Sequence, residues 1–194
     1  MDKLVSDLIK RGEVGILPTD TIYGIVGSAL NKKTVERIYK VRRRTPSKPL
    51  IILIGSFSDL TTLGIKNPPL KILKTLWPAK ITVILPVVSK KFEYLHRGTN
   101  TLAFRMPDSK SLLALLKKTG PIVAPSANPE GKSPAETVEE AAGYFGINAD
   151  FYVDDGKMKG EPSTIVEIDK KGKISLVREG AVKSSGKKLK GLLQ

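Results

Sequence analysis

The chain has 194 residues, of which 40% are hydrophobic, so it can bury a sizeable core. We predict one domain over residues 1–182 and a lysine-rich tail or short helix over 183–194. The absence of cysteine excludes disulfides, thiolate catalysis and cysteine-bound metals, and a single histidine, His96, excludes a multi-histidine metal centre. No apolar run approaches the roughly 20 residues that cross a bilayer, and the first residues lack a signal-peptide core. We therefore expect a cytoplasmic protein with no membrane partner.

Basic residues outnumber acidic ones by 33 to 19, which gives a formal net charge of +14. Such an excess favours polyanionic partners, including nucleotides and RNA. A lysine-rich solvated surface explains most of the charge equally well. Two stretches fit that explanation less easily, because neither contains an acid. Residues 37–48 carry six basic side chains, and residues 183–190 carry four lysines.

Taken in chain order, the apolar residues follow helix and strand spacings in turn. Asp2 is the expected cap of a first helix that has Leu4 on its apolar face and stops at Gly12. A second helix is predicted to start near Asn31. Short strands are predicted at 14–17, 50–54, 81–85, 101–105, 122–124, 164–168 and 173–177. Further helices are predicted over 69–76, from a cap at 108 or 109 to 118, and over 136–145 after Pro134.

The last two predicted strands flank residues 169–172, whose sequence Asp-Lys-Lys-Gly is a hairpin turn signal. Helices and strands interleave along the chain, yet this closing hairpin must be antiparallel. We therefore expect an α/β (α+β) fold, an open, twisted, mixed sheet with helices packed on it. A regular parallel Rossmann sheet does not fit this order.

Four polar clusters stand where predicted strands begin or end, which is where α/β sheets collect groups that contact ligands. They lie at 18–24 (PTDTIYG), 42–50 (RRRTPSKPL), 126–128 (SAN) and 162–166 (PSTIV). Their cations, hydroxyls and amide suit holding a phosphate-bearing substrate better than attacking one. The chain has neither the Walker A pattern nor the dinucleotide fingerprint, so a P-loop NTPase or an NAD enzyme is disfavoured.

Arg42, Arg44 and Lys48 lie at the end of the second predicted helix and before a buried strand. Forked guanidinium donors and a compact ammonium can converge there on one triphosphate. Favourable charge at a helix C-terminus explains the same residues. Pro46 and Pro49 stiffen the loop, which reduces the entropy lost on gripping a ligand and favours the first interpretation.

The remaining polar candidates each have a local explanation. Ser126 and Asn128 offer a hydroxyl and an amide on a turn between prolines, but such a turn also satisfies its own backbone. Ser163, at a strand start, carries the same ambiguity. Ser133 is explained better as the cap of the helix that follows than as a ligand contact. His96, in a polar stretch, is predicted to lie on the surface.

In their order and spacing, these motifs resemble those of the YrdC-like family, the threonylcarbamoyl-AMP synthases of tRNA modification. The matching segments are 18–24, 42–50, 77–78 (Trp-Pro), 105–107 (Arg-Met-Pro), 126–129, 163–166 and 178–180 (Arg-Glu-Gly). The resemblance covers residues 3 to about 182. It implies the YrdC fold, an open mixed sheet around a basic concave cleft, in a stand-alone catalytic domain.

The chain departs from the family pattern at several positions. Arg42 replaces a lysine, and Thr45 replaces the proline that follows the second cation of that motif. Lys80 ends a Trp-Pro-Ala-Lys segment that is Trp-Pro-Gly-Pro in the pattern. Leu53 stands where a histidine is often found, which indicates a more apolar threonine pocket.

The resemblance implies a nucleotidyltransferase that condenses L-threonine, bicarbonate or CO2, and ATP into L-threonylcarbamoyl-adenylate and pyrophosphate. Because the substrate supplies the nucleophile, the protein has to position two anions and neutralise developing charge. The roles implied for catalysis fall to Arg42, Arg44 and Asn128. Those for ATP fall to Arg44, Lys48, Thr101, Ser126, Asn128, Ser133 and Arg178, and those for threonine to Thr21, Arg105 and Ser163. Mg2+ is expected on the phosphates, with no protein side chain as a metal ligand.

The product implies a further partner, which is tRNA or the tRNA-modifying threonylcarbamoyl transferase. A rival from another class is a non-catalytic protein whose basic cleft binds double-stranded RNA or tRNA through phosphates. A third possibility is a carbamoyl transferase that resembles the YrdC-like part of hydrogenase maturation factors. Threonine- and bicarbonate-dependent release of pyrophosphate separates the first hypothesis from the second.

Overall fold

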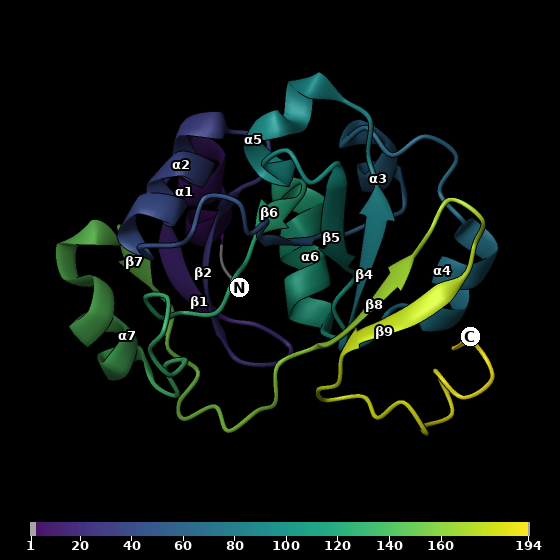
Figure 1. Cartoon of the computed structure of the whole chain (residues 1–194). Coiled ribbons are helices and arrows are strands. Elements are labelled where there is room, and N and C mark those ends of the chain that lie inside the picture. The colour runs from purple at the N-terminus through teal and green to yellow at the C-terminus, as the bar shows by residue number, and fades with distance from the viewer. Residues whose placement is uncertain (1–2, 194) are drawn as a thin grey trace.

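The computed structural model describes residues 3–193, and within them one mixed sheet of nine strands runs through the molecule (Figure 1). The strand order is β7-β1-β2-β6-β3-β5-β4-β8-β9. The strands are β1 (Gly15–Pro18), β2 (Tyr23–Ser28), β3 (Ile51–Leu53), β4 (Ile81–Pro86), β5 (Thr101–Arg105), β6 (Ile122–Val123), β7 (Phe151–Tyr152), β8 (Thr164–Ile168) and β9 (Ile174–Arg178). The strand predicted over 50–54 is the middle one of the nine.

Parallel and antiparallel pairs mix in this sheet, which confirms the predicted class. The pairs β1–β7, β3–β5 and β4–β8 are parallel, and the other five are antiparallel. The hairpin predicted around 169–172 joins β8 to β9, and Asp169 Oδ1 accepts hydrogen bonds from the backbone N–H groups of Lys171 (2.8 Å) and Lys173 (2.9 Å). This Asx turn is the reason why the four-residue signal specifies a hairpin.

The described residues form seven α-helices and two 3-10 turns. They are α1 (Lys3–Arg11), α2 (Lys32–Val41), α3 (Ser58–Thr62), α4 (Leu70–Leu76), α5 (Glu93–His96), α6 (Lys110–Thr119), α7 (Val138–Phe145), η1 (Lys90–Phe92) and η2 (Gly146–Asn148). None of them is long and apolar enough to cross a membrane. Figure 1 shows α7 beside β7 at one edge of the sheet, and β9 at the other.

The predicted start of the second helix near Asn31 and the predicted cap at Ser109 are confirmed. Asn31 Oδ1 accepts from Thr34 N at the start of α2, and Ser109 Oγ accepts from Leu112 N at the start of α6. The predicted cap Asp2 lies outside the described residues.

The prediction that Ser133 caps the last helix is wrong. That helix, α7, starts at Val138, and Thr137 caps it by accepting from Glu140 N at 3.2 Å. Residues 133–136 stay irregular because their backbone is used elsewhere. Ala135 N donates to the Ala127 carbonyl (3.1 Å), and the Glu136 carbonyl accepts from Met158 N.

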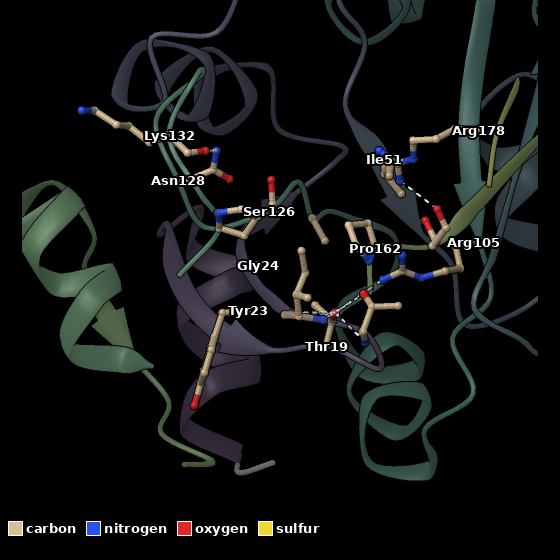
Figure 2. Close-up of a pocket in the computed structure, with 15 residues that line it drawn as sticks. Thr19, Tyr23, Gly24, Ile51, Arg105, Ser126, Asn128, Lys132, Pro162 and Arg178 are labelled. Carbon is tan, nitrogen blue, oxygen red and sulfur yellow. Dashed lines mark hydrogen bonds between the residues drawn. The ribbon is translucent and has the colours of Figure 1, made fainter. Parts of the chain in front are cut away.

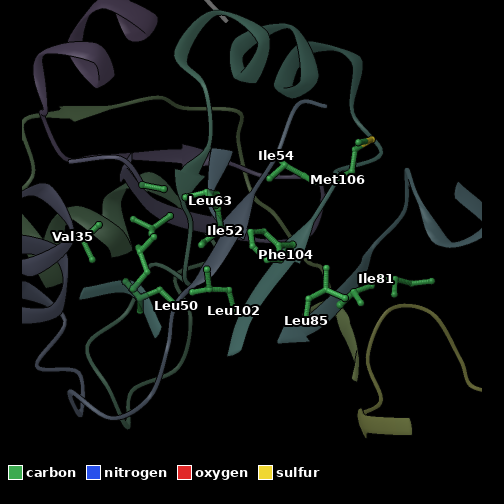
Figure 3. Close-up of a cluster of buried hydrophobic side chains, with 14 of the residues drawn as sticks. Val35, Leu50, Ile52, Ile54, Leu63, Ile81, Leu85, Leu102, Phe104 and Met106 are labelled. Atoms are coloured by element: carbon green, nitrogen blue, oxygen red, sulfur yellow. The ribbon is translucent and has the colours of Figure 1, made fainter. Parts of the chain in front are cut away.

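The two faces of the sheet have separate cores. The larger one packs residues such as Ile52 and Phe104 against α2, α3, α4, α5 and α7 (Figure 3). The smaller one packs Leu53 and Ile122 under α1 and α6. Leu4, which was expected on the apolar face of the first helix, is 68% exposed. Helix α1 contacts α6 through a narrower stripe than the pattern suggested.

On the face of the smaller core, helices cover only the half of the sheet near β1, β2 and β6. Partly exposed residues alternate with buried ones along β8, from Thr101 to Phe104 in β5, and from Val83 to Pro86 in β4. Because successive side chains of a strand point to opposite faces, this alternation shows that one face of the second half lacks helix cover. The partly exposed residues on β5 are Thr101 and Ala103. The candidate site lies where the covered half meets the open half.

His96 is 4% exposed, so its predicted surface position is wrong: the short helix α5 turns the ring inward, where Nδ1 accepts from Gly98 N at 3.2 Å. Residues 183–193 follow successive turns that pack on the sheet edge. Leu189 is fully buried, and Lys188 Nζ donates to the Pro78 carbonyl at 2.9 Å. Because the stretch around His96 and residues 183–193 are both rich in polar residues, their sequences do not indicate these buried contacts.

Candidate functional site

A cavity of about 240 Å³ opens between the two halves of the sheet (Figure 2). Figure 2 shows Arg105 and Arg178 on one wall and Ser126, Asn128 and Lys132 on the other. The full lining is Thr19, Thr21, Ile22, Tyr23, Gly24, Ile51, Arg105, Ala124, Ser126, Asn128, Lys132, Pro134, Pro162, Ser163 and Arg178. Six of the predicted site residues are among them, drawn from segments far apart in the chain.

Arg105, the last residue of β5, forms the centre of one wall. It is 3% exposed, and its Nη2 lies 3.0 Å from Asp20 Oδ1 in an ion pair whose two side chains are both almost fully buried. Its Nε has no hydrogen-bond partner. Burial lowers the pKa of Arg105, with a smaller contribution from nearby Arg178, while Asp20 opposes the change. A buried guanidinium with one free donor is a ready contact for an incoming anion.

Asp20 was not predicted as a site residue, although it lies within the first motif. Its neighbours fold into a tight turn in which Thr19 Oγ1 donates to the Ile22 carbonyl (2.7 Å) and accepts from Thr21 N (3.2 Å). This turn leaves the hydroxyls of Thr19 and Thr21 facing one another at 3.0 Å. Gly160 fits tightly against it, because a Cβ there would lie 1.9 Å from the Thr21 carbonyl oxygen.

Ser163 and Arg178 complete the Arg105 wall. The Ser163 hydroxyl shares a 2.8 Å hydrogen bond with the hydroxyl of Thr82, and both side chains are buried. Arg178, the last residue of β9, donates from Nη2 to the Ser163 carbonyl at 2.8 Å. Burial lowers the pKa of Arg178. Strand ends thus hold both arginines, as the sequence argument expected of polar residues at those positions.

Arg42 stands behind the opposite wall and does not line the cavity. Its side chain is buried, with Nε donating to the Asn128 carbonyl (2.9 Å) and Nη2 to Ser126 Oγ (3.2 Å). Burial, and then the nearby charge of Arg44, lowers its pKa to about 10. Nη1 is buried without a partner. These contacts make Arg42 a support for the two residues predicted to touch the nucleotide.

The Asn128 side chain is used locally. Its amide Nδ2 donates to the carbonyls of Lys132 (2.7 Å) and Pro129 (2.9 Å). The turn-forming interpretation that the sequence left open is therefore confirmed. A contact between Asn128 and a phosphate stays a prediction.

Besides Arg42, four predicted residues lie outside the cavity lining. Arg44 and Lys48 are on the loop after α2, where Lys48 Nζ contacts Glu130 Oε1 at 2.6 Å. Ser133 is exposed next to Lys132. Thr101 begins β5, four residues before Arg105, and bonds to the hydroxyl of Thr99. Thr101 does lie on the open sheet face that adjoins the cavity, since alternate residues of a strand share a face.

Residues that the sequence argument missed include Thr19, Asp20, Lys132 and Glu130. Asp20 could have been found, because an acid in a buried turn has to pair with a cation. The other three depend on loop geometry that no local pattern encodes. Within residues 3–193, no group of three or more His, Asp or Glu side chains lies close enough to hold a metal ion.

Comparison with known proteins agrees with the geometry. Residues 7–180 match the model of the Sua5/YciO/YrdC family, which is described as "Telomere recombination". A threonylcarbamoyl-AMP synthase of Pyrococcus abyssi is 32% identical over 171 residues, which are 86% of this chain and 50% of that protein. A putative threonylcarbamoyl-AMP synthase of Methanocaldococcus jannaschii is 32% identical over 183 residues, 90% of this chain and 83% of that protein.

Among solved structures, P. abyssi Sua5 complexed with L-threonine superposes with a TM-score of 0.86 at 29% identity. The match covers 98% of this chain and 57% of that one. The chain therefore spans about half the length of these Pyrococcus proteins.

Proposed function

The chain belongs to the Sua5/YciO/YrdC family, and we propose that it forms L-threonylcarbamoyl-adenylate from L-threonine, bicarbonate or CO2, and ATP, with release of pyrophosphate. The observation that carries the proposal is the buried Arg105, which lines a cavity of about 240 Å³ and whose Nε has no hydrogen-bond partner. That volume lies below the ~300–1,000 Å³ of sites that enclose drug-sized ligands, so it suits a small amino acid. The similarity to a Sua5 chain complexed with L-threonine supports the same ligand.

In this proposal the threonine carboxylate pairs with Arg105. The Asp20 ion pair fixes the guanidinium, and a forked donor holds a carboxylate with defined orientation. Hydroxyls of Thr21 and Ser163 lie on the same cavity wall and are suited to the polar ends of the substrate. The apolar side chains of Ile22 and Ile51 leave room for the threonine methyl.

The amine of the substrate must lose its proton before it can attack CO2. Two guanidinium groups, Arg105 and Arg178, disfavour a third positive charge nearby and so lower the pKa of that amine. The neutral amine then forms an N–C bond to CO2 and releases a proton, which gives a carbamate. A carbamate oxygen attacks the α-phosphorus of ATP, forming an O–P bond while the bond to the leaving pyrophosphate breaks.

We place the nucleotide over the open sheet face beside the cavity, where Thr101 and Arg178 lie at opposite sides. The phosphates would then reach Lys132 and the loop that carries Arg44 and Lys48. Mg2+ accompanying ATP would take phosphate and water oxygens as ligands, because the described residues offer no acidic cluster and Mg2+ keeps several waters when bound. The protein's part is to position the two anions and to supply positive charge.

The test is a pyrophosphate-release assay on the purified chain, with and without threonine and bicarbonate. We expect release that requires both, together with a product carrying the mass of threonylcarbamoyl-adenylate. ATP hydrolysis that ignores threonine would contradict the proposal. Such a product is consumed by transfer to a tRNA adenosine, so the downstream partner is tRNA or the transferase that acts on it.

One observation favours the rival, a non-catalytic RNA-binding protein. A groove between α2 and α7 is lined by Arg37, Lys40, Arg43 and Lys132 beside Tyr144, a set that suits phosphates and a stacked base. Arg37 is already paired with Asp150, which leaves three cations for RNA. Binding of tRNA that weakens steeply with salt and is indifferent to threonine and ATP would favour the rival.

A further inference from the structure

The Glu130 carboxylate accepts three hydrogen bonds from the loop after α2. Thr45 donates to Oε2 through its backbone N–H (2.5 Å) and its hydroxyl (2.9 Å), and Lys48 Nζ donates to Oε1 (2.6 Å). These contacts hold the pKa of Glu130 down to about 2, with Lys48 as the largest cause. A backbone N–H, a hydroxyl and an ammonium are also the donors that proteins use to bind phosphate oxygens.

Glu130 also joins this loop to the cavity. Its backbone N–H donates to the Arg42 carbonyl at 2.8 Å. Two residues earlier in the same turn is Asn128, and two residues later is Lys132, both of which line the cavity. Glu130 therefore links the turn that lines the cavity to the cations of the loop.

Two of the three donors belong to Thr45, one from its backbone and one from its side chain. A proline, which the family pattern has at this position, carries neither an N–H nor a hydroxyl. The pairing of Thr45 with Glu130 is thus a property of this chain. A carboxylate among these cations satisfies them when no nucleotide is bound, and it repels an incoming phosphate.

We propose that Thr45 and Lys48 form a phosphate-binding site, called here the seat, and that the Glu130 carboxylate is an internal competitor for it. ATP then binds only by displacing this carboxylate from the seat. This inference rests on the proposed function for the identity of the ligand, a nucleoside triphosphate. If the seat is free for a fraction f of the time, the apparent dissociation constant of the ligand is raised by 1/f. With its pKa near 2, Glu130 stays ionised at neutral pH, so protonation does not open the seat.

The experiment compares Glu130→Gln with the wild type in calorimetric titrations with ATP and with inorganic tripolyphosphate, without threonine. Glutamine keeps the shape and removes the charge. We expect both ligands to bind at least about threefold more tightly, which corresponds to f of about one third. Glu161→Gln is the matched control, because Glu161 forms an exposed lysine pair, with Lys183 at 3.2 Å, away from the loop. Its effect on either ligand should be much smaller.

A double-mutant cycle provides the second measurement. In the wild type, Lys48 must leave Glu130 before it can hold a phosphate, so Lys48→Ala should weaken ATP binding only modestly. In the Glu130→Gln background the same change should cost more, giving a coupling between the two positions. Thermal unfolding of each variant verifies that the fold is retained.

Several results would overturn the proposal. Weaker ATP binding by Glu130→Gln would mean that the carboxylate supports the loop. Equal effects of Glu130→Gln and Glu161→Gln would mean that the gain in affinity comes from the change in net charge alone. Additive effects in the cycle would also contradict it. If Glu130→Gln tightens tripolyphosphate binding while threonine-dependent pyrophosphate release is absent, the competitor stands and the proposed reaction fails. If no variant binds either ligand, both ideas fall.

Discussion

The two walls of the cavity hold their cations in opposite ways. On one wall Arg105 ends a central strand, and its pair with Asp20 leaves 4% and 1% of the two side chains exposed. On the loop beyond the other wall, the pair of Lys48 with Glu130 leaves 57% and 24% exposed. The charges of a buried pair have lost their hydration, so separating them costs much free energy. An exposed pair contributes little net stabilisation, so either charge can exchange its partner for another ion.

The difference assigns a different task to each wall. A guanidinium fixed by a buried carboxylate defines one position for a small substrate, and its remaining Nε donor has no competitor. A lysine on an exposed, proline-stiffened loop can move between its own glutamate and a phosphate. The first wall provides preorganisation, and the second provides an exchange of partners. Substitutions on each side of that contrast should therefore differ in the size of their effects.

Removing the acid from the buried pair should give the largest loss of stability. Asp20→Ala leaves Arg105 charged and buried without its partner, which typically costs about 3–5 kcal/mol. The free energy of unfolding, measured with urea, should fall by that amount. Glu161→Ala, which breaks an exposed lysine pair, should change it by about 0–1 kcal/mol. Equal losses in the two variants would mean that the walls do not differ in the way described.

The next effect concerns the support behind the second wall. Arg42→Ala removes the donors of the Asn128 carbonyl and of Ser126 Oγ, and an unsatisfied buried acceptor costs about 1–3 kcal/mol. The unfolding free energy should fall in that range. Arg42→Lys keeps the charge but not the two forked guanidinium donors, so it should recover only part of the lost unfolding free energy. Full recovery with lysine would show that charge, and not the two hydrogen bonds, holds this turn.

These comparisons also show what a sequence can reveal. β5 and the β8–β9 hairpin were predicted because strand alternation and a turn signal are local properties. β2 was missed: its two glycines, Gly24 and Gly27, hide the strand pattern. There the backbone needs space, because a Cβ on Gly27 would lie 2.3 Å from the Thr34 methyl.

The same limit applies to the site. Arg105, Ser163 and Arg178 could be proposed as neighbours because polar residues at strand ends meet at one place in a sheet. The partners that loops bring to the other site residues could not be proposed. Glu130 binds a lysine 82 positions earlier in the chain. Arg42, at the end of a helix, donates to the carbonyl of Asn128, which lies far later in the chain. Such pairs follow from how loops pack, and a single sequence carries no local signal for them.

The third prediction concerns the ligand of the first wall. Arg105→Lys replaces a forked donor by a point charge while keeping the pair with Asp20. In a steady-state assay of pyrophosphate release, the KM for threonine should rise at least tenfold, about 1.4 kcal/mol, and the KM for ATP much less. A similar change in both constants would place Arg105 between the substrates, and no change in either would remove it from the site.

The last and smallest effect extends the comparison to an exposed pair away from the cavity. Arg37 holds Asp150 with two hydrogen bonds, of 2.5 and 2.8 Å, and the side chains are 35% and 27% exposed. The pKa of Asp150 falls to about 2, chiefly because Arg37 donates to it. A lowered pKa in the folded state means that this stabilisation is complete above pH 4 and is lost as the pH falls towards 2. Solvent limits it to about 1 kcal/mol. Wild type and Asp150→Asn should therefore differ by that amount in urea unfolding at pH 7 and converge below pH 2. A difference of 3 kcal/mol or more would show that a forked arginine pair behaves as a buried one even at the surface.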